Sequence, residues 1–222
     1  MKERAFSFYE YAGIVVPGTA LLFGLFFVLP EIKSIFLKGG FGVGDLGLFV
    51  IISYVAGHLI AAVGNLLELF WWGLRGGMPS LWVVRKNQRL LAPEQIVKLE
   101  ARVRARLGLQ SITIVGMEPG RWEPVFGQLR AEVAREGRDA RAEIFNGNYG
   151  MSRGIASAFL MVALINVAAA WTEWRVTLVS ILLFLLALTR MNRFGIHYAR
   201  AMLWEFLQLP ESEKERLKVT VP

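Results

Sequence analysis

The sequence predicts an all-α membrane protein with four transmembrane helices, and two observations lead to this prediction. The chain of 222 residues is 55% hydrophobic and only 19% charged, which is too apolar for an ordinary soluble domain of this length. Four apolar runs are long enough, or nearly so, to cross about 30 Å of hydrocarbon at about 1.5 Å per residue. The predicted spans cover about residues 13–29, 46–67, 155–171 and 176–189.

The distribution of basic residues predicts the orientation of these spans. Of 25 Lys and Arg residues, only Lys33, Lys38 and Arg175 fall in the two short loops of one side. The positive-inside rule therefore places both termini and the central segment in the cytoplasm. The net charge of +7 is explained by topology and by contact with anionic lipid headgroups on that side, so nucleic acid is not an expected partner. The absence of cysteine is compatible with a cytoplasm-facing protein, and we expect the bacterial cytoplasmic (inner) membrane.

The spans divide the chain into four parts. We expect a first transmembrane hairpin over residues 1–73 and a mostly helical cytoplasmic insertion over 74–152. A second hairpin with a basic amphipathic extension follows over 153–209, and a charged tail over 210–222. In the insertion, helical spacing predicts one helix over 93–107 and another after Pro124, with a short β-like run at 111–116. This is too little core for a rich independent domain, so we expect the insertion to pack on the bundle or on a partner.

The second predicted span carries the candidate site. Its polar residues recur at helical spacing, with His58 and Asn65 within about 20° of each other, so that they form one stripe. Polar groups at membrane depth are costly unless they face a partner or water, which makes the stripe a functional candidate. The alternative is ordinary hydrogen-bonded packing. The stripe comprises Tyr54, His58, Asn65 and Glu68; Asn166 of the third span is a candidate hydrogen-bond partner, and Gly57, Ala61 and Gly64 are the predicted helix-packing residues.

Three further groups of residues are candidates. Pro17 and Gly18 predict either a hinge or a packing kink in the first span. A cluster at the membrane surface predicts headgroup hydrogen bonding or a ligand or gating site. A basic face after the fourth span predicts binding of lipid headgroups, or else of an anionic ligand or an acidic partner helix. The surface cluster is Asn146, Asn148, Tyr149 and Arg153, and the basic face is Arg190, Arg193, His197 and Arg200.

The sequence predicts no catalytic, cofactor or metal site. His58 and His197 are the only histidines, and neither lies in a metal-binding motif such as HExxH. Catalysis would need an acid, base or nucleophile with an orienting partner, and the sequence offers only isolated candidates. A lipid-modifying enzyme acting through Glu68, His58 or His197 is therefore the least favoured function.

Three stretches together resemble a known group of proteins. They are the aromatic start with Pro17–Gly18, the stretch FNGNYGMSRG at Phe145–Gly154, and RFGIHYARAMLWEF at Arg193–Phe206. They resemble uncharacterised bacterial four-helix integral membrane proteins with one cytoplasmic insertion, some of which are membrane components of antiviral defence systems. The resemblance implies no catalytic residues.

The resulting hypothesis is a non-enzymatic, homo-oligomeric membrane protein that acts as a channel-like effector or membrane sensor. Because four short spans cannot enclose a sizeable pore, a conduit would require several copies of the chain. The alternative is an accessory subunit that docks a soluble cytoplasmic protein through residues 74–152.

Overall fold

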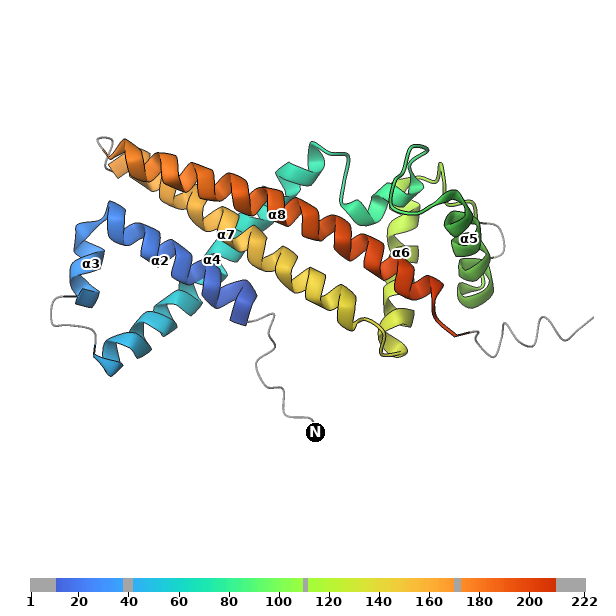
Figure 1. Cartoon of the computed structure of the whole chain (residues 1–222), viewed down its shortest axis with the longest axis horizontal. Helices are drawn as coiled ribbons and strands as arrows, with labels where there is room; N and C mark the ends of the chain where they lie inside the picture. The colour runs from blue at the N-terminus through green and yellow to red at the C-terminus, as the bar shows by residue number, and fades with distance from the viewer. Residues whose placement is uncertain (1–10, 38–41, 110–111, 170–172, 211–222) are drawn as a thin grey trace, which may run out of the picture. The chain divides into compact units, whose positions relative to one another are not determined.

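The computed structural model of the chain describes residues 11–37, 42–109, 112–169 and 173–210, and every regular element within them is helical (Figure 1). Lys38, most of the predicted tail 210–222 and the end of the third predicted span lie outside the described residues. The elements are a π-helix η1 (Tyr11–Val15), α2 (Val16–Val28), α3 (Pro30–Leu37), α4 (Val43–Gly73), a 3₁₀-helix η2 (Pro79–Val84), α5 (Pro93–Leu107), α6 (Pro119–Arg135), α7 (Ala140–Ala169) and α8 (Trp174–Leu207).

Three of the described helices, α4, α7 and α8, are long and apolar enough to cross a membrane. The first predicted span corresponds to a shorter apolar helix, Gly13–Val28, which rises only about 24 Å. It ends at Leu29, whose backbone is extended (φ −125°, ψ 92°) because a residue that precedes a proline is pushed out of the helical region. Pro30 then begins α3. The structure therefore has three full-length candidate spans and one shorter apolar helix.

The chain forms two compact units, which are described separately. The first unit comprises residues 1–74 and 146–194, and the second comprises 75–145 and 195–222. Both α7 and α8 are continuous through the boundary between the units.

In the first unit, glycines allow α2 and η1 to lie almost backbone to backbone against α4. A Cβ atom at Gly18 would overlap the carbonyl oxygen of Ser53, and one at Gly57 would overlap the carbonyl oxygen of Ile14. Without a hydrophobic driving force in lipid, helices associate through such close packing of small residues. Gly57 therefore packs within the chain, as predicted for it.

The second unit has its own hydrophobic core, built around Trp122 of α6. The indole N–H of Trp122 donates to the carbonyl oxygen of Ser80 at 2.9 Å, and the surrounding side chains come from α5, α6 and the end of α8. Met202 and Phe206 of α8 are fully buried in this core. The insertion thus obtains the apolar area that its own two helices lack from the last turns of α8.

Two details of the insertion differ from the prediction. No strand forms over the described residues 112–116; instead, the backbone N–H of Ile114 donates to the carboxylate of Glu100 at 2.7 Å. Without a neighbouring strand this run has no ladder to satisfy its backbone groups, so they bond elsewhere; the N–H of Gly116 donates to the carbonyl oxygen of Val84 at 2.7 Å. The second helix begins at Pro119, with Pro124 inside its first turns, because Pro119 at its first position can begin a helix equally well.

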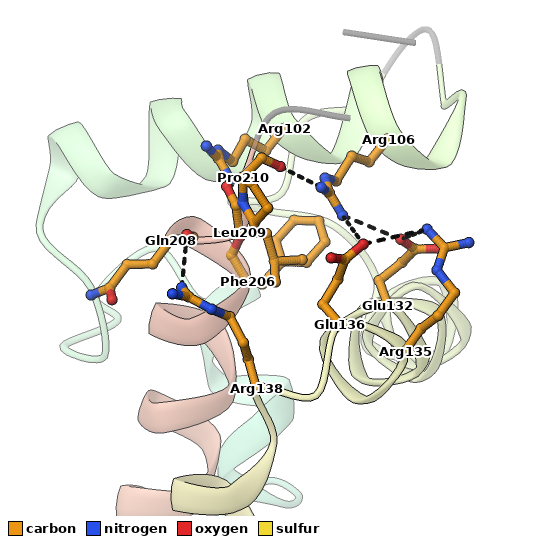
Figure 2. Close-up of polar contacts among 10 residues, drawn as sticks. All are labelled: Arg102, Arg106, Glu132, Arg135, Glu136, Arg138, Phe206, Gln208, Leu209 and Pro210. Carbon is orange, nitrogen blue, oxygen red and sulfur yellow. Dashed lines mark hydrogen bonds and ion pairs between the residues drawn. The ribbon is translucent and has the colours of Figure 1, made fainter. Parts of the chain in front are cut away.

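Three arginines bind the C-terminal end of α8 within the second unit (Figure 2). Arg102 donates to the carbonyl oxygens of Phe206 (3.3 Å) and Leu209 (2.5 Å), and Arg138 donates to that of Gln208 (3.0 Å). Arg106 donates to the carbonyl oxygen of Pro210 and forms an ion pair with Glu132 at 3.3 Å. The last carbonyls of a helix have no intrahelical partner and carry partial negative charge, so guanidinium groups both satisfy and stabilise this end.

Candidate functional site

An ion pair between α4 and α7 is the centre of the polar site in the first unit. The guanidinium of Arg153 donates to the carboxylate of Glu68, and the two side chains are only 18% and 23% exposed. Glu68 was predicted as part of the intramembrane stripe, whereas Arg153 was predicted in the membrane-surface cluster. The structure brings the two groups together, so that each charge has a partner in a region of restricted water access.

Two aromatic side chains extend this site. The indole N–H of Trp72 donates to the hydroxyl of Tyr149 at 2.8 Å, and both residues are buried. The guanidinium of Arg153 lies 6.0 Å from the centre of the Tyr149 ring, at the limit of a cation–π contact. The site therefore brings together a cation (Arg153), a carboxylate (Glu68) and a phenol (Tyr149) between α4 and α7.

Gly64 provides the space for this arrangement. A Cβ atom there would lie 3.3 Å from Nε of Arg153 and 3.4 Å from the hydroxyl oxygen of Ser157, which is tighter than ordinary van der Waals contact. A larger residue would push the Arg153 side chain away from Glu68. Gly64 is thus a packing residue, and it packs against the Arg153 side chain of the ion pair.

The rest of the predicted stripe faces away from the first unit. Tyr54, His58 and Asn65 are exposed, and the rings of Tyr54 and His58 meet edge to face with 4.7 Å between their centres. Ala61 is half-buried between this outward row and the glycines that pack inward. The stripe is therefore divided: Glu68 faces α7, and Tyr54, His58 and Asn65, which we call the outward row, do not.

Asn166 does not pair with Asn65 or His58, contrary to the prediction for it. Its amide donates to the carbonyl oxygen of Glu173 at 2.9 Å and to the hydroxyl of Thr177 at 2.7 Å. These contacts join the end of α7 to the start of α8. Asn166 lies near the C-terminal end of α7, 13 residues beyond Arg153, so it stabilises the α7–α8 hairpin rather than the site.

Pro17 and Gly18 occupy a tight packing contact, and the hinge or kink predicted for them stays a prediction. Gly18 meets α4, and the ring of Pro17 lies where a Cβ atom at Gly154 of α7 would be, 2.5 Å from Cγ. The π-helix η1 immediately precedes this contact. Both residues are buried, so the irregular helix start is enclosed by its neighbours.

The predicted basic face on α8 is divided between the two units. In the first unit Arg190 lies over the ring of Phe194 at 5.0 Å, and Arg193 is exposed. In the second unit His197 stacks on Phe145 with 5.4 Å between ring centres, and Arg200 donates to the carbonyl oxygen of Arg89 at 3.2 Å. Half of the predicted face thus makes structural contacts within the second unit.

The two asparagines of the predicted surface cluster are half-buried on α7, between one and two turns before Arg153. The carbonyl oxygen of Asn148 accepts a hydrogen bond from the hydroxyl of Ser152 at 2.7 Å. The role predicted for Asn146 and Asn148 at a ligand or gating site stays a prediction.

Trp72 is a residue of the site that was not predicted from the sequence. A signal was present, because residues i and i+4 of a helix lie on the same face and Trp72 follows Glu68 by four positions. Its partner Tyr149 likewise precedes Arg153 by four positions on α7. The two pairs of equal spacing face each other across the two helices.

No protein-family model, curated protein or solved structure matches this chain.

Proposed function

We propose that this chain is a non-enzymatic, homo-oligomeric integral membrane protein that acts as a channel-like effector or sensor. The single observation that carries the proposal is the outward row on α4. An exposed histidine and asparagine in an apolar helix are costly against lipid, and a second copy of the chain would cover them.

The proposal places four spans in the bacterial inner membrane with both termini in the cytoplasm. The helical run from η1 into α2 supplies the fourth span, because Tyr11–Val28 together rise about 27 Å. A span slightly shorter than the hydrocarbon thickness is accommodated by local thinning of the bilayer or by oligomerisation. The second unit is then the cytoplasmic part, in agreement with the distribution of basic residues.

The ion pair supplies a link that a sensor requires. Glu68 and Arg153 hold α4 to α7, and α7 continues into the second unit. A change that separates the pair would leave two uncompensated charges, so the pair favours one arrangement of α4 and α7 strongly over others. We propose that ligand or membrane state acts by shifting this arrangement.

The oligomer is tested by native mass spectrometry of the purified protein. The variant His58→Leu/Asn65→Leu removes the polarity of the outward row, and we expect it to shift wild-type oligomers toward single chains. The matched control is Leu59→Ala/Leu66→Ala, since these exposed residues lie at the same depth about 100° around α4. If His58→Leu/Asn65→Leu retains the wild-type oligomer, the outward row does not form the contact between copies.

The channel-like activity is tested separately by measuring the membrane potential of cells at matched protein levels. We expect expression of the wild-type chain to depolarise the cells and the His58→Leu/Asn65→Leu variant to lose this effect. A wild-type oligomer that leaves the potential unchanged would contradict the constitutive conduit and favour the sensor.

An accessory subunit that docks a soluble protein is the second candidate, and an exposed apolar residue of α5 favours it. Val97 is 67% exposed on the second unit, which has its own core. We expect Val97→Lys to abolish co-purification of a cytoplasmic partner and the neighbouring Lys98→Ala to leave it unchanged. Equal co-purification with both variants would contradict docking through this face.

A further inference from the structure

The first unit contains an apolar groove that belongs neither to the polar site nor to the outward row. It has a volume of about 430 Å³ and is lined by α2, α7 and α8. Its walls include Phe23 and Phe27 of α2, Phe159 and Val162 of α7, and Val179 of α8. The volume lies within the range of about 300–1,000 Å³ that is usual for small-molecule sites, which are mostly apolar with few polar groups.

Close packing between α2 and α7 forms part of the groove wall. A Cβ atom at Gly24 would meet Cγ2 of Val162 at 2.5 Å, so no side chain on α2 can fill this position. On either side of Gly24 in the sequence, Phe23 and Phe27 are 58% and 60% exposed and contact each other edge to face at 5.3 Å. The groove is thus an apolar slot with an aromatic wall that is already ordered.

One cation stands in the lining of this groove. Arg175 lies in the first turn of α8, is exposed, and has its guanidinium 5.8 Å from the Trp174 ring. Within the described part of the chain, no carboxylate lies at ion-pair distance from Arg175. A cation at the N-terminal end of a helix is disfavoured by the helix dipole, whereas an anion there is stabilised by both the dipole and the guanidinium.

We propose that this groove binds one anionic glycerophospholipid, with an acyl chain in the slot and the phosphate at Arg175. An aliphatic chain suits the apolar walls, and the neighbouring Trp174 is an exposed aromatic of the kind found at headgroup level. A helix of another chain is a poorer occupant of this groove. A helix is about 10–12 Å across, and a stable contact between proteins buries about 1,000 Å² of surface, which is more than a groove of this size provides. The inference rests on the membrane placement proposed above and on neither the oligomer nor the channel-like activity.

This site differs from the headgroup contacts predicted for the arginines that follow the fourth span. Those arginines lie from the middle of α8 onward, at least 15 residues beyond Arg175. The groove combines a single cation with a slot for the chain, so it selects a lipid by charge and by shape together.

The proposal is tested by adding lipids to the delipidated full-length protein and counting bound molecules by native mass spectrometry. We expect one phosphatidylglycerol per chain in this groove, bound about tenfold more tightly than phosphatidylethanolamine, because the ammonium group of phosphatidylethanolamine competes with the Arg175 guanidinium for the phosphate and is repelled by it. Arg175→Gln should remove this preference, and Arg121→Gln, which removes an exposed arginine of the second unit, should retain it. Equal binding of both lipids by the wild-type chain would overturn the proposal.

A second pair of variants tests the slot itself. Val179→Phe adds volume inside the groove and should reduce the binding of both lipids at least about tenfold. Leu182→Phe adds the same kind of bulk on an exposed position of α8 outside the lining and should have no effect. If Val179→Phe binds phosphatidylglycerol as the wild type does, the lipid lies elsewhere and the proposal is wrong. The wild-type protein could instead form an oligomer that holds no lipid. If Val179→Phe then separates its copies, the groove is a contact between chains, and the lipid proposal is wrong.

Discussion

Glu68 on α4 and Arg153 on α7 form an ion pair between residues that are 85 positions apart in the chain. The contact requires α4 and α7 to be rotated so that Glu68 and Gly64 both face Arg153. Of the hydrogen bonds and ion pairs described within the first unit, this pair joins the most distant parts of the sequence, so its removal is the most direct test of how α4 and α7 are held together.

We expect Glu68→Leu to lower the free energy of unfolding by about 2 kcal/mol. Removing one partner of a buried pair costs about 3–5 kcal/mol and of an exposed pair at most about 1, and this pair is partly buried. Glu68→Leu/Arg153→Leu should recover most of the loss, because no charge is then left without a partner. The measurement is a double-mutant cycle on the purified protein, with Arg190→Leu as the control that should be additive with Glu68→Leu. Additivity of Glu68 with Arg153 would contradict the pairing.

We expect Gly18→Ala to destabilise the first unit by about 1–3 kcal/mol, because the new methyl group would overlap the backbone carbonyl of Ser53. Gly47→Ala on α4 is the matched control, since a Cβ atom there meets nothing within 4 Å. That control should be neutral or stabilising by about 0.5–1 kcal/mol through helix propensity. Thermal unfolding of both variants checks the prediction, and equal midpoints would show that α2 and α4 do not approach this closely.

We expect Tyr149→Phe to cost about 1 kcal/mol, since the buried indole N–H of Trp72 would lose its acceptor. Trp72→Phe removes the donor at the same contact together with some packing. The two substitutions should therefore be less costly together than the sum of the single losses. Strict additivity in the unfolding free energies would mean that the two side chains do not interact.

We expect Arg102→Ala to loosen the end of α8 in the second unit. Arg102 donates to the carbonyl oxygens of both Phe206 and Leu209, so its loss removes two of the side-chain hydrogen bonds that hold this end. Hydrogen exchange of the amides over residues 202–209 should accelerate at least about tenfold, which corresponds to about 1.4 kcal/mol of local opening. Arg104→Ala, which removes only an exposed pair with Glu100, should leave this exchange unchanged.

In the insertion, helical spacing predicted α5 but not the rest of the core. Ile96, Leu99 and Val103 recur on one face, and α5 forms over Pro93–Leu107 as predicted, ending where Gly108 adopts φ 72°. The β-like run after α5 was wrong over its described residues, because β-propensity is realised only when a partner strand is near. The contribution of α8 to this core was also missed, since its residues lie some seventy to one hundred positions later in the chain.

The candidate site shows the same limit. Helical spacing predicts that Tyr54, His58, Asn65 and Glu68 lie along one side of a helix. It does not determine which of them face inward. Their angular separations are a few tens of degrees, comparable to the width of a helix contact. The position of the neighbouring helices, set by Gly57 and Gly64, decides that Glu68 is enclosed and that the other three are not.

By itself the sequence determined the helical character of the chain, three long apolar helices, and the proline that ends the shorter apolar helix before them. These properties depend on transfer free energies and backbone preferences, which act over a few neighbouring residues. Only the tertiary structure decided that Arg153 meets Glu68, that Asn166 bonds across its own hairpin and that the end of α8 completes the core of the second unit. Such contacts depend on how each helix is rotated and displaced against its neighbours, and in this chain the close approach at a few glycines sets that rotation.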